Sequence, residues 1–310
     1  MALEKLDPGR VNNDSPHTLP FSAKPSLIWN TTLLSYRHSF HAGNFADVLK
    51  HIVLVEILEH LSQKDKPFGY IDTHSGAGLY DLYSETATKL GEHQGGISKL
   101  KADKWPELKS YFDAIDGCNK DGKLRFYPGS PLIATQYLRQ KDKAWLYELH
   151  PKDYQLLKQN TARHRQVIAT NEDSLSNVLG LIPPASRRGV MLVDPSYEIK
   201  SDYEDVFKLI KQAHSKFSTG TYALWYPVVD RQRINKLERR FINSGIKNIQ
   251  RFELGLEPDS VERGMTSSGM IVINPPWKLM GKMTQLLPRL SKALDTGDGA
   301  LYRCDQLVDE

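Results

Sequence analysis

Seven short apolar runs, rich in β-branched and aromatic residues, alternate along the chain with stretches of helical periodicity. The runs span residues 67–73, 144–150, 166–171, 189–195, 221–229, 248–256 and 270–275. Strands that alternate with helices favour a doubly wound α/β fold, in which helices cover a largely parallel sheet. Only 13 residues separate the last two runs, which is short for a helical crossover and suits a hairpin. We therefore expect a mostly parallel, seven-stranded sheet whose last strand is antiparallel.

The spacing of acids at the ends of these runs predicts one domain with an insertion. Asp72 lies 76 residues before Glu148, whereas the next two intervals, to Asp173 and then to Asp194, are 25 and 21 residues. We expect a helical insertion at about 83–123, where helix-forming and charged residues dominate. Residues 1–33 contain four prolines and no sustained periodicity. We expect them to be a flexible or loosely docked extension of a domain at 34–310.

Composition excludes several classes of protein. With 310 residues, 40% of them hydrophobic and 25% charged, the chain can bury a core and is neither disordered nor fibrous. Its two cysteines, Cys118 and Cys304, exclude a disulfide framework and a four-cysteine zinc site, and favour a reducing compartment. No run of about 18 apolar residues and no signal-peptide pattern is present. We expect a cytoplasmic protein without a membrane segment.

A glycine turn follows the first run. The strand ends at Asp72 and continues through Gly76 and Gly78 toward a predicted helix. Glycine lets the backbone approach a nucleoside, while Glu148 and Asp173 at later strand ends can accept hydrogen bonds from a ribose and an adenine amine. This arrangement is typical of an S-adenosylmethionine site. The alternatives are a tight turn and exposed strand-end acids, and the missing third glycine opposes a pyrophosphate cradle.

The fourth run ends in Asp194-Pro195-Ser196-Tyr197. An amine attached to an aromatic ring is a poor nucleophile, because its lone pair is delocalised. The Asp194 carboxylate and the Pro195 carbonyl can accept hydrogen bonds from such an amine, and Tyr197 can stack on a flipped-out base. The tetrapeptide is the Asp-Pro-Pro-Tyr motif of amino methyltransferases with Ser196 in place of the second proline. The alternative is a turn that only terminates the strand.

A second tetrapeptide of this form is Asn274-Pro275-Pro276-Trp277. Asp194 follows the fourth strand, beside the first strand where a methyl donor is expected to bind. Asn274 instead closes the reversed last strand. We therefore assign the chemistry to Asp194 and expect Asn274 to be part of a turn that lines the cleft.

Positive charge gathers between residues 230 and 251, where seven cations stand against two anions. The resulting +5 exceeds the +4 of the whole chain. Ile234, Leu237 and Phe241 share one helical face, which leaves the cations on the solvent side. Such a face suits a phosphate backbone, and the alternative is an ordinary solvated helix. The cations for which we expect RNA contact are Arg233, Lys236 and Arg240.

The segment 35–51 is rich in aromatic and basic side chains. His38 and His41 lack further ligands at usable spacing, so we expect no metal site. Stacking and phosphate pairing are the contacts that such side chains make with RNA, and the alternative is a polar segment packed on the sheet. The residues for which we expect RNA contact are Tyr36, Arg37 and Lys50. Motifs of phosphate-binding loops, serine hydrolases and zinc deaminases are absent.

Seven motifs resemble those of one bacterial family. They are Ser-Tyr-Arg-His-Ser-Phe-His-Ala-Gly-Asn (35–44), Asp-Thr-His-Ser-Gly-Ala-Gly (72–78), Tyr-Pro-Gly-Ser-Pro (127–131), Glu-Leu-His-Pro (148–151), Ser-Arg-Arg-Gly (186–189), Ala-Leu-Trp-Tyr-Pro-Val-Val (223–229) and Gly-Met-Ile-Val-Ile-Asn-Pro-Pro-Trp-Lys (269–278). From about residue 34 to the end, the chain resembles the 23S ribosomal RNA adenine-N(6) methyltransferase J family. Residues 1–33 have no counterpart in that resemblance.

The resemblance implies S-adenosylmethionine-dependent methylation of the N(6) amine of one adenine in 23S ribosomal RNA. It implies a Rossmann-like class I methyltransferase fold with a small helical insertion. Asp194 would be the proton acceptor, and Tyr36 would meet the RNA. The residues expected at the methyl donor are His51, His74, Gly76, Ser130, Glu148, Asp173, Ser174 and Asp194, with Ser174 standing where glycine is expected.

Three alternatives stay open. One is a non-catalytic RNA-binding relative whose Ser196 turn no longer orients the amine. Another is a dinucleotide oxidoreductase, which the missing third glycine opposes. A third is a DNA adenine methyltransferase, because the tetrapeptide serves amines of both nucleic acids. Our prediction is a monomeric cytoplasmic enzyme that uses S-adenosyl-L-methionine and acts on 23S ribosomal RNA, with no metal and no membrane contact.

Overall fold

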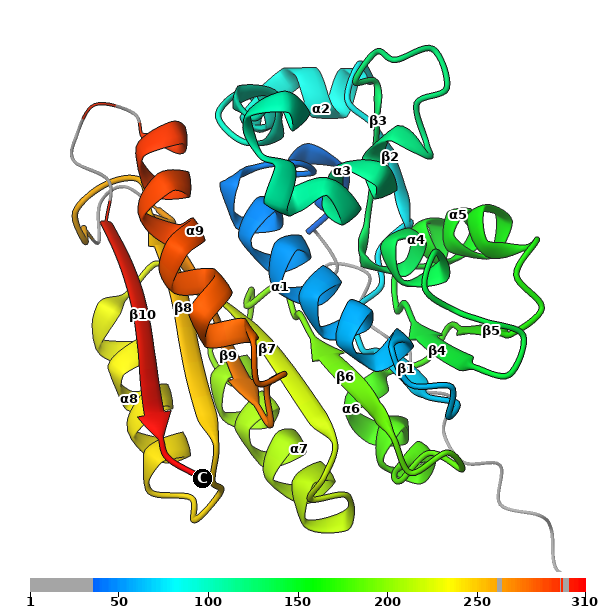
Figure 1. The fold of residues 1–310 in the computed structure, drawn as a ribbon, viewed down its shortest axis with the longest axis vertical. Helices are drawn as coiled ribbons and strands as arrows, with labels where there is room; N and C mark the ends of the chain where they lie inside the picture. The colour runs from blue at the N-terminus through cyan, green and yellow to red at the C-terminus, as the bar shows by residue number, and fades with distance from the viewer. Residues whose placement is uncertain (1–35, 261–263, 296, 298–300) are drawn as a thin grey trace, which may run out of the picture. The chain divides into compact units, whose positions relative to one another are not determined.

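The computed structural model describes residues 36–260, 264–295, 297 and 301–310. Within them, one sheet has eight strands in the order β10-β8-β9-β7-β6-β1-β4-β5 (Figure 1). Its strands are β1 (Gly69–Asp72), β4 (Lys143–Tyr147), β5 (Val167–Thr170), β6 (Gly189–Val193), β7 (Thr221–Val228), β8 (Ile249–Gly255), β9 (Ser267–Ile273) and β10 (Leu301–Val308). Seven of these overlap the seven predicted runs. The predicted strand number is one too low, because β10 was not anticipated.

The sheet is mixed in direction. β5, β4, β1, β6 and β7 are parallel to one another. β9 is antiparallel to β7 and β8, which confirms the predicted reversed strand, and β10 is antiparallel to β8. β4 lies on one side of β1 and β6 on the other, so the strand order reverses at β1. Open α/β sheets bind ligands at such a point, beyond the carboxyl ends of the strands.

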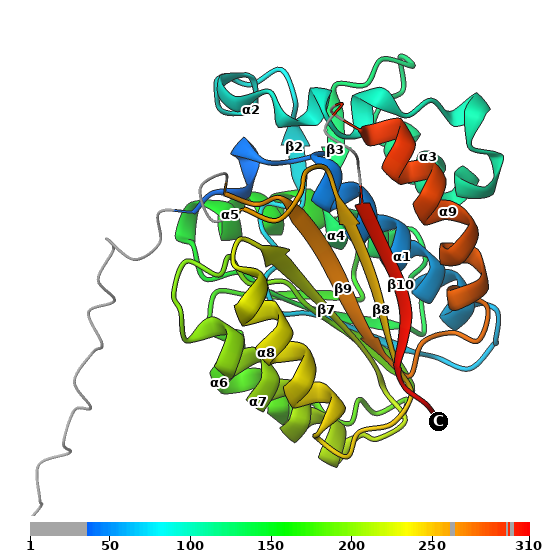
Figure 2. The ribbon, with the colours of Figure 1, turned by 90° about the vertical axis from the view of Figure 1, so that its left-hand side faces the viewer.

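Helices cover both faces of the sheet (Figures 1 and 2). One face carries α1 (Phe45–Ser62) and α9 (Leu279–Leu294), and the other carries α7 (Asp202–Lys216) and α8 (Arg231–Ile242). Successive residues of β9 alternate between the two cores. Met270 and Val272 belong to the core that includes α1 and α9, and Ile271 belongs to the core that includes α7 and α8.

The helix α1 is apolar almost all round because it is covered on two sides. It begins after Asn44, whose side chain accepts a hydrogen bond from the Asp47 N–H at 3.0 Å. The sheet packs against one side of α1, and α3 (Lys109–Asp116), α4 (Ser130–Thr135) and α9 pack against others. The polar residues of its first turns are therefore buried together with its apolar ones. No helix in the described part of the chain is long and apolar enough to cross a membrane.

The region in which we expected a helical insertion, about 83–123, holds α2 (Glu85–Leu90), α3 and short 3-10 helices. These are η3 (Glu92–Gln94), η4 (Ile97–Lys99), η5 (Ala102–Lys104) and η6 (Pro106–Leu108). They connect β2 (Leu79–Asp81) and β3 (Phe126–Pro128), which form a two-stranded antiparallel sheet. The glycine turn therefore leads into β2, and the prediction of a helix directly after it is wrong.

The remaining elements are short connections around the sheet. They are η2 (His38–Phe40), α5 (Pro151–Thr161), α6 (Ser174–Asn177) and η7 (Val178–Leu181). α5 follows β4 and α6 follows β5, so both helices begin where the parallel strands end. We call this side of the sheet, at the carboxyl ends of the parallel strands, its carboxyl edge. The expected extension at residues 1–33 lies outside the described residues.

Candidate active site

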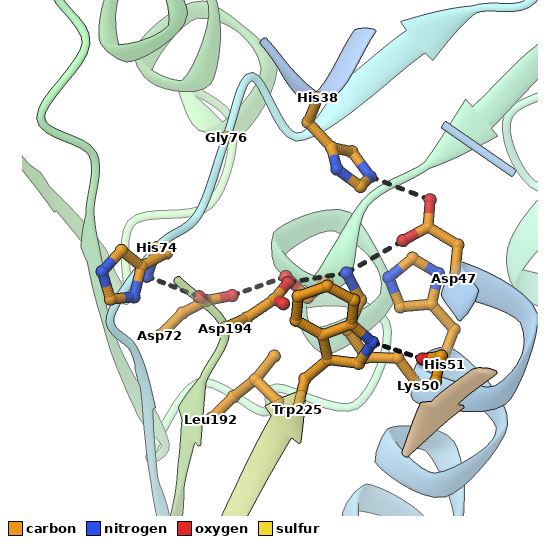
Figure 3. Close-up of polar contacts among 12 residues, drawn as sticks. His38, Asp47, Lys50, His51, Asp72, His74, Gly76, Leu192, Asp194 and Trp225 are labelled. Carbon is orange, nitrogen blue, oxygen red and sulfur yellow. Dashed lines mark hydrogen bonds and ion pairs between the residues drawn. The ribbon is translucent and has the colours of Figure 1, made fainter. Parts of the chain in front are cut away.

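Three carboxylates meet at the carboxyl edge of the sheet. Asp72 ends β1, Glu148 directly follows β4, and Asp194 directly follows β6. These strands are parallel neighbours, so their carboxyl ends lie at one edge, where Figure 3 shows Asp72 and Asp194 near each other. The edge is the one at which the strand order reverses, and it is the expected place for a ligand.

A buried lysine orients Asp194. Lys50 of α1 donates to Asp194 Oδ2 at 2.6 Å, and no group of the described residues donates to Oδ1. Burial raises the pKa of Asp194 to about 6, and the Lys50 ammonium opposes that rise. We expected Lys50 to contact RNA, but only 5% of its side chain is exposed. Lys50 instead holds Oδ2 of the Asp194 carboxylate, and Oδ1 remains to accept a hydrogen bond from a ligand.

Lys50 continues into a chain of polar groups that leads away from Asp194 (Figure 3). Its ammonium lies 2.8 Å from Asp47 Oδ1, and Asp47 Oδ2 lies 2.8 Å from His38 Nε2. His38 Nδ1 in turn lies 2.8 Å from the Tyr36 hydroxyl. Although burial favours protonation, His38 and Lys50 hold the pKa of Asp47 well below its usual range. The Lys50 ammonium thus lies between two carboxylates, and His38 pairs with the outer one.

The glycine turn and Glu148 hold each other in place. Gly76 has a φ of +61°, and a Cβ there would collide with the Tyr80 hydroxyl. Its N–H donates to Glu148 Oε2 at 2.7 Å, and the His150 N–H donates to Oε1 at 2.6 Å. Burial raises the pKa of Glu148 to about 7, although the two N–H donors oppose the rise. Each carboxylate oxygen has two lone pairs, so Glu148 can accept further hydrogen bonds from a ligand.

Asp72 organises the centre of the site, although we did not select it from the sequence. It is fully buried and accepts hydrogen bonds from the Tyr70 hydroxyl at 2.6 Å and from Ser130 Oγ at 2.7 Å. The His74 N–H approaches its other oxygen at 3.3 Å. Ser130 was expected to bind a cofactor, but its hydroxyl links Asp72 to the first turn of α4. An acid at the end of an apolar strand, directly before a glycine turn, was the signal for Asp72.

The two histidines expected at a cofactor are uncharged at neutral pH. Burial lowers the pKa of His51 to about 3 and that of His74 to about 4. His51 is 1% exposed and bonds the Tyr127 hydroxyl at 2.8 Å, whereas His74 lies in the glycine turn and bonds Thr73 Oγ1 at 2.8 Å. Among the described residues, no group of three or more His, Cys, Asp or Glu side chains is placed to hold a metal ion.

Asp173 and Ser174 form the start of α6. Asp173 caps this helix, because its Oδ1 accepts from the Leu175 N–H at 3.0 Å and its Oδ2 from Ser176 Oγ at 2.7 Å. Ser174 is buried in the first turn. Both residues follow β5, the neighbour of β4, so they lie at the same edge of the sheet as Glu148.

Two aromatic rings lie near Asp194. Tyr197 has a φ of +54°, a left-handed conformation that costs free energy for tyrosine and is enriched at functional sites. Its ring centre is 5.8 Å from that of Trp225, whose carbonyl accepts from the Tyr197 hydroxyl at 2.7 Å. Trp225 of β7 was not predicted as a site residue, yet Lys50 Nζ lies 5.8 Å from its ring centre. Ser268 accepts the indole N–H at 2.7 Å and fixes the ring.

Tyr36 and Arg37 are both partly exposed and make different contacts. Tyr36 is 36% exposed and stacks on His41, with ring centres 5.4 Å apart. Arg37 donates through Nη2 to Asp153 of α5 at 3.0 Å. We expected both residues to contact RNA. In this structure Tyr36 keeps an exposed ring, whereas Arg37 ties the beginning of the described chain to α5.

Acids of its own N-cap and of α7 neutralise much of the positive charge on α8. Arg233 pairs with Asp230, and Arg240 pairs with Glu204 of α7. Lys236 is the one expected RNA contact of this helix that forms no ion pair with any described residue. The predicted apolar face of α8 is buried, but its predicted phosphate-binding face is reduced to isolated cations.

The second tetrapeptide lies at the opposite edge of the sheet, because β9 runs in the reverse direction. Asn274 has a φ of +51°, and its amide donates to the carbonyls of Ser218 and Gly220 at 2.7 and 2.8 Å. The topology agrees with our assignment of the chemistry to Asp194. The prediction that Asn274 lines the same cleft is wrong.

Known proteins share the sequence and the fold of this chain. A family model named ribosomal RNA large subunit methyltransferase D, RlmJ, matches residues 65–305. A protein of Escherichia coli (strain K12) named ribosomal RNA large subunit methyltransferase J is 50% identical over 270 residues, 86% of this chain and 96% of that protein. A protein of the same name from Haemophilus influenzae is 49% identical over 265 residues, 84% of this chain and 94% of that protein. The crystal structure of a Legionella pneumophila protein has 37% sequence identity and a TM-score of 0.79, and the match covers 86% of this chain and 98% of that one.

Proposed function

The chain belongs to the ribosomal RNA large subunit methyltransferase J family, and from that membership we propose that it methylates the exocyclic N6 amine of one adenine in 23S ribosomal RNA. The names of the relatives support a large-subunit ribosomal RNA as the substrate. The acid-proline turn at Asp194 supports an amine as the acceptor. S-adenosylmethionine is the methyl donor of this family and supplies a methyl group on a positively charged sulfur.

The residues at the carboxyl ends of β1 and β4 suit that donor. Gly76 presents no side chain to a nucleoside, and Glu148 beside it offers carboxylate oxygens to ribose hydroxyls. Asp173 and Ser174 begin the next helix at the same edge, where they can meet the adenine ring of the donor.

Three other residues expected at the donor differ in how directly they can contact it. His74 lies in the glycine turn and can meet the donor directly as a neutral ring. Ser130 acts through Asp72, to which it donates at 2.7 Å. His51 is buried and hydrogen-bonds the Tyr127 hydroxyl, so we assign it a packing role and no direct contact with the donor.

Asp194 Oδ1 is the group that we assign to the adenine amine. A hydrogen bond from the amine to this oxygen reduces delocalisation of the nitrogen lone pair into the ring and makes it a better nucleophile. Lys50 fixes the carboxylate on its other oxygen, so the acceptor is oriented before the substrate arrives. With a pKa of about 6, Asp194 is ionised at neutral pH and can accept the proton that the amine loses. This lysine-held carboxylate beside the glycine turn is the observation that carries the proposal.

The aromatic residues provide the surface for a flipped-out base. Tyr197 and Trp225 are linked by the hydroxyl-to-carbonyl hydrogen bond and lie beside Asp194 and Lys50. A base stacked on them would keep its amine in line with the methyl group. Tyr36 adds an exposed ring at the outer end of the polar chain. We further propose that the enzyme is a monomer of the bacterial cytoplasm, where ribosomal RNA is made.

Methyl transfer from labelled S-adenosylmethionine to protein-free 23S RNA tests the proposal, with the RNA taken from cells that lack this protein. We expect N6-methyladenosine in the digested product by mass spectrometry. Asp194→Ala should lower the rate at least about a thousandfold, a magnitude typical of lost transition-state hydrogen bonding, while donor binding by calorimetry stays largely intact. Tight donor binding without any label would instead support a non-catalytic relative or another substrate.

A further inference from the structure

A strongly basic surface lies at the sheet edge opposite the candidate active site. It consists of the residues that lead into β1, β4, β5 and β6, four neighbouring strands of the sheet. We call it the basic edge. Its cations are Lys64, Lys66, Arg139, Lys141, Lys143, Arg163, Arg165, Arg187 and Arg188, and its acids are Asp65 and Asp142. Its net charge of +7 exceeds the +4 of the whole chain, so the rest of the protein is net acidic.

Hydrogen bonds join these loops into one surface. Arg139 donates to the carbonyls of Lys64 and Lys66 at 2.8 and 2.9 Å. Arg188, from the loop before β6, donates to the Lys66 carbonyl at 3.0 Å. Lys141 pairs with Asp65, which connects the loop before β4 to the loop before β1. Arg139, Lys141 and Arg188 thus tie the loops before β1, β4 and β6 together.

Most of the positive charge is available to a partner. Six exposed cations of the basic edge form no ion pair with any residue that the structure describes; they are Lys64, Lys66, Lys143, Arg163, Arg165 and Arg187. The pKa of Arg188 is lowered by burial and by the charge of Arg139, and that of His60 by burial and by Arg188 and Lys64.

We propose that the basic edge binds the phosphate backbone of a second segment of the RNA substrate, remote from the methylated adenine. The proposal rests on the proposed function, which supplies the RNA. Dispersed, exposed cations suit the repeating charge of a nucleic-acid backbone. Surfaces that bind anionic membranes add apolar side chains to their cations, and none of the exposed large apolar residues lies in these loops. That contrast favours RNA over a lipid surface.

The distance between the two edges suits a folded RNA. β4 and β5 have five and four residues, which at about 3.3 Å per residue separate the edges by roughly 15 Å. β5 is the outermost strand on this side of the sheet. An RNA whose adenine enters the carboxyl edge can therefore pass around β5 and place other phosphates on the basic edge.

The test compares two triple variants with equal loss of charge. The basic-edge variant combines Lys143→Gln, Arg163→Gln and Arg165→Gln, and the control combines Lys120→Gln, Lys211→Gln and Lys292→Gln, which lie after α3, on α7 and on α9. The control lysines are exposed and form no ion pair with described residues. Methyl transfer is measured with full-length 23S RNA and with a short fragment around the methylated nucleotide.

We expect the basic-edge variant to raise the KM for full-length RNA about tenfold with kcat unchanged, and to leave the short fragment unaffected. The slope of the logarithm of the RNA-binding constant against the logarithm of salt concentration should become less steep by about two to three. An unchanged salt dependence, an equal loss in the control, or lost binding to anionic phospholipid vesicles with RNA binding intact would overturn the proposal. A wild-type protein that binds RNA without methylating it would contradict the proposed function alone.

Discussion

Lys50 determines the ionisation of the proposed catalytic carboxylate. Burial favours the protonated form of Asp194, and the ammonium 2.6 Å away favours the ionised form. Asp47, on the other side of Lys50, adds a negative charge that raises the pKa of Asp194. The two neighbours therefore act on Asp194 in opposite directions, which makes their roles separable.

Substitution of each neighbour should shift the pH profile of kcat in opposite directions. The rate requires ionised Asp194, so it should fall as the pH drops through about 6. Lys50→Met removes the stabilising cation, raises the pKa of Asp194 and moves the acid limb to higher pH. Asp47→Asn removes a repelling anion and moves the limb to lower pH. Single-turnover rates between pH 5 and 9 measure both shifts, with Lys50→Arg as the charge-conserving control, and shifts in the same direction would refute this account.

Glu148 should make donor binding depend on pH. Its pKa of about 7 in the free protein means that it is only partly ionised near neutrality. Ribose hydroxyls donate to the ionised form, so binding lowers its pKa, releases a proton and becomes tighter as the pH rises from 6 to 8. Calorimetry in buffers of different ionisation enthalpy measures the released proton. Glu148→Gln should weaken donor binding by about tenfold and abolish its pH dependence, and a Glu148→Gln variant that retained this dependence would contradict the assignment.

At the scale of the element, α8 shows that a helix can look basic in the sequence and yet offer few free charges. Its apolar face packs as the periodicity predicts. The acids that neutralise Arg233 and Arg240 come from its own cap and from α7. A count of charges along one helix does not show that Asp230 at the cap pairs with Arg233, and it does not include the acids of the neighbouring helix α7.

The combined variant Arg233→Gln, Lys236→Gln, Arg240→Gln should therefore have a small effect on RNA binding. We expect the slope of the logarithm of the binding constant against the logarithm of salt concentration to become less steep by about one. Only Lys236 is unpaired, whereas loss of three phosphate contacts would change the slope by about three. Filter binding of 23S RNA between about 50 and 300 mM salt measures this slope. A fall of about three would show that Arg233 and Arg240 also leave their acidic partners to contact phosphates, and would contradict this prediction.

The strands that the sequence predicts and the strand that it misses differ in burial. β9 is buried along its whole length, and such apolar runs stand out in any sequence. β10 is an edge strand with no fully buried residue, and its Leu-Tyr-Arg-Cys-Asp-Gln-Leu-Val has neither an apolar run nor strict alternation. Its pairing with β8 defines it, and pairing between distant segments is not visible in local sequence.

At the scale of the whole molecule, the sequence predicts the acidic half of the site better than the basic half. Parallel strands bring their carboxyl ends to one edge, so topology alone places Glu148, Asp173 and Asp194 together. Lys50 reaches Asp194 from a helix 144 residues earlier, and only the packing of α1 on the sheet brings them into contact. We interpreted Lys50 as a surface cation because burial of a charge depends on a partner that cannot be read locally.

The distribution of positive charge also depends on contacts between distant segments. The largest local excess in the sequence lies at 230–251, but much of it is paired in space. The basic edge is built from four short segments, none of which is conspicuous alone. Its net charge appears only when the sheet order brings the four segments together.

The position of α1 before the sheet also has a consequence for synthesis of the protein. At about 5 to 20 residues per second, Asp194 is made roughly 7 to 30 s after Lys50. During that interval an 18-residue helix with 14 buried residues in the final fold has no complete sheet to pack on. The nascent chain thus exposes an apolar helix that carries an unpaired lysine, a form suited to chaperone binding. The proposed catalytic pair of Lys50 and Asp194 can form only when the fourth parallel strand has left the ribosome.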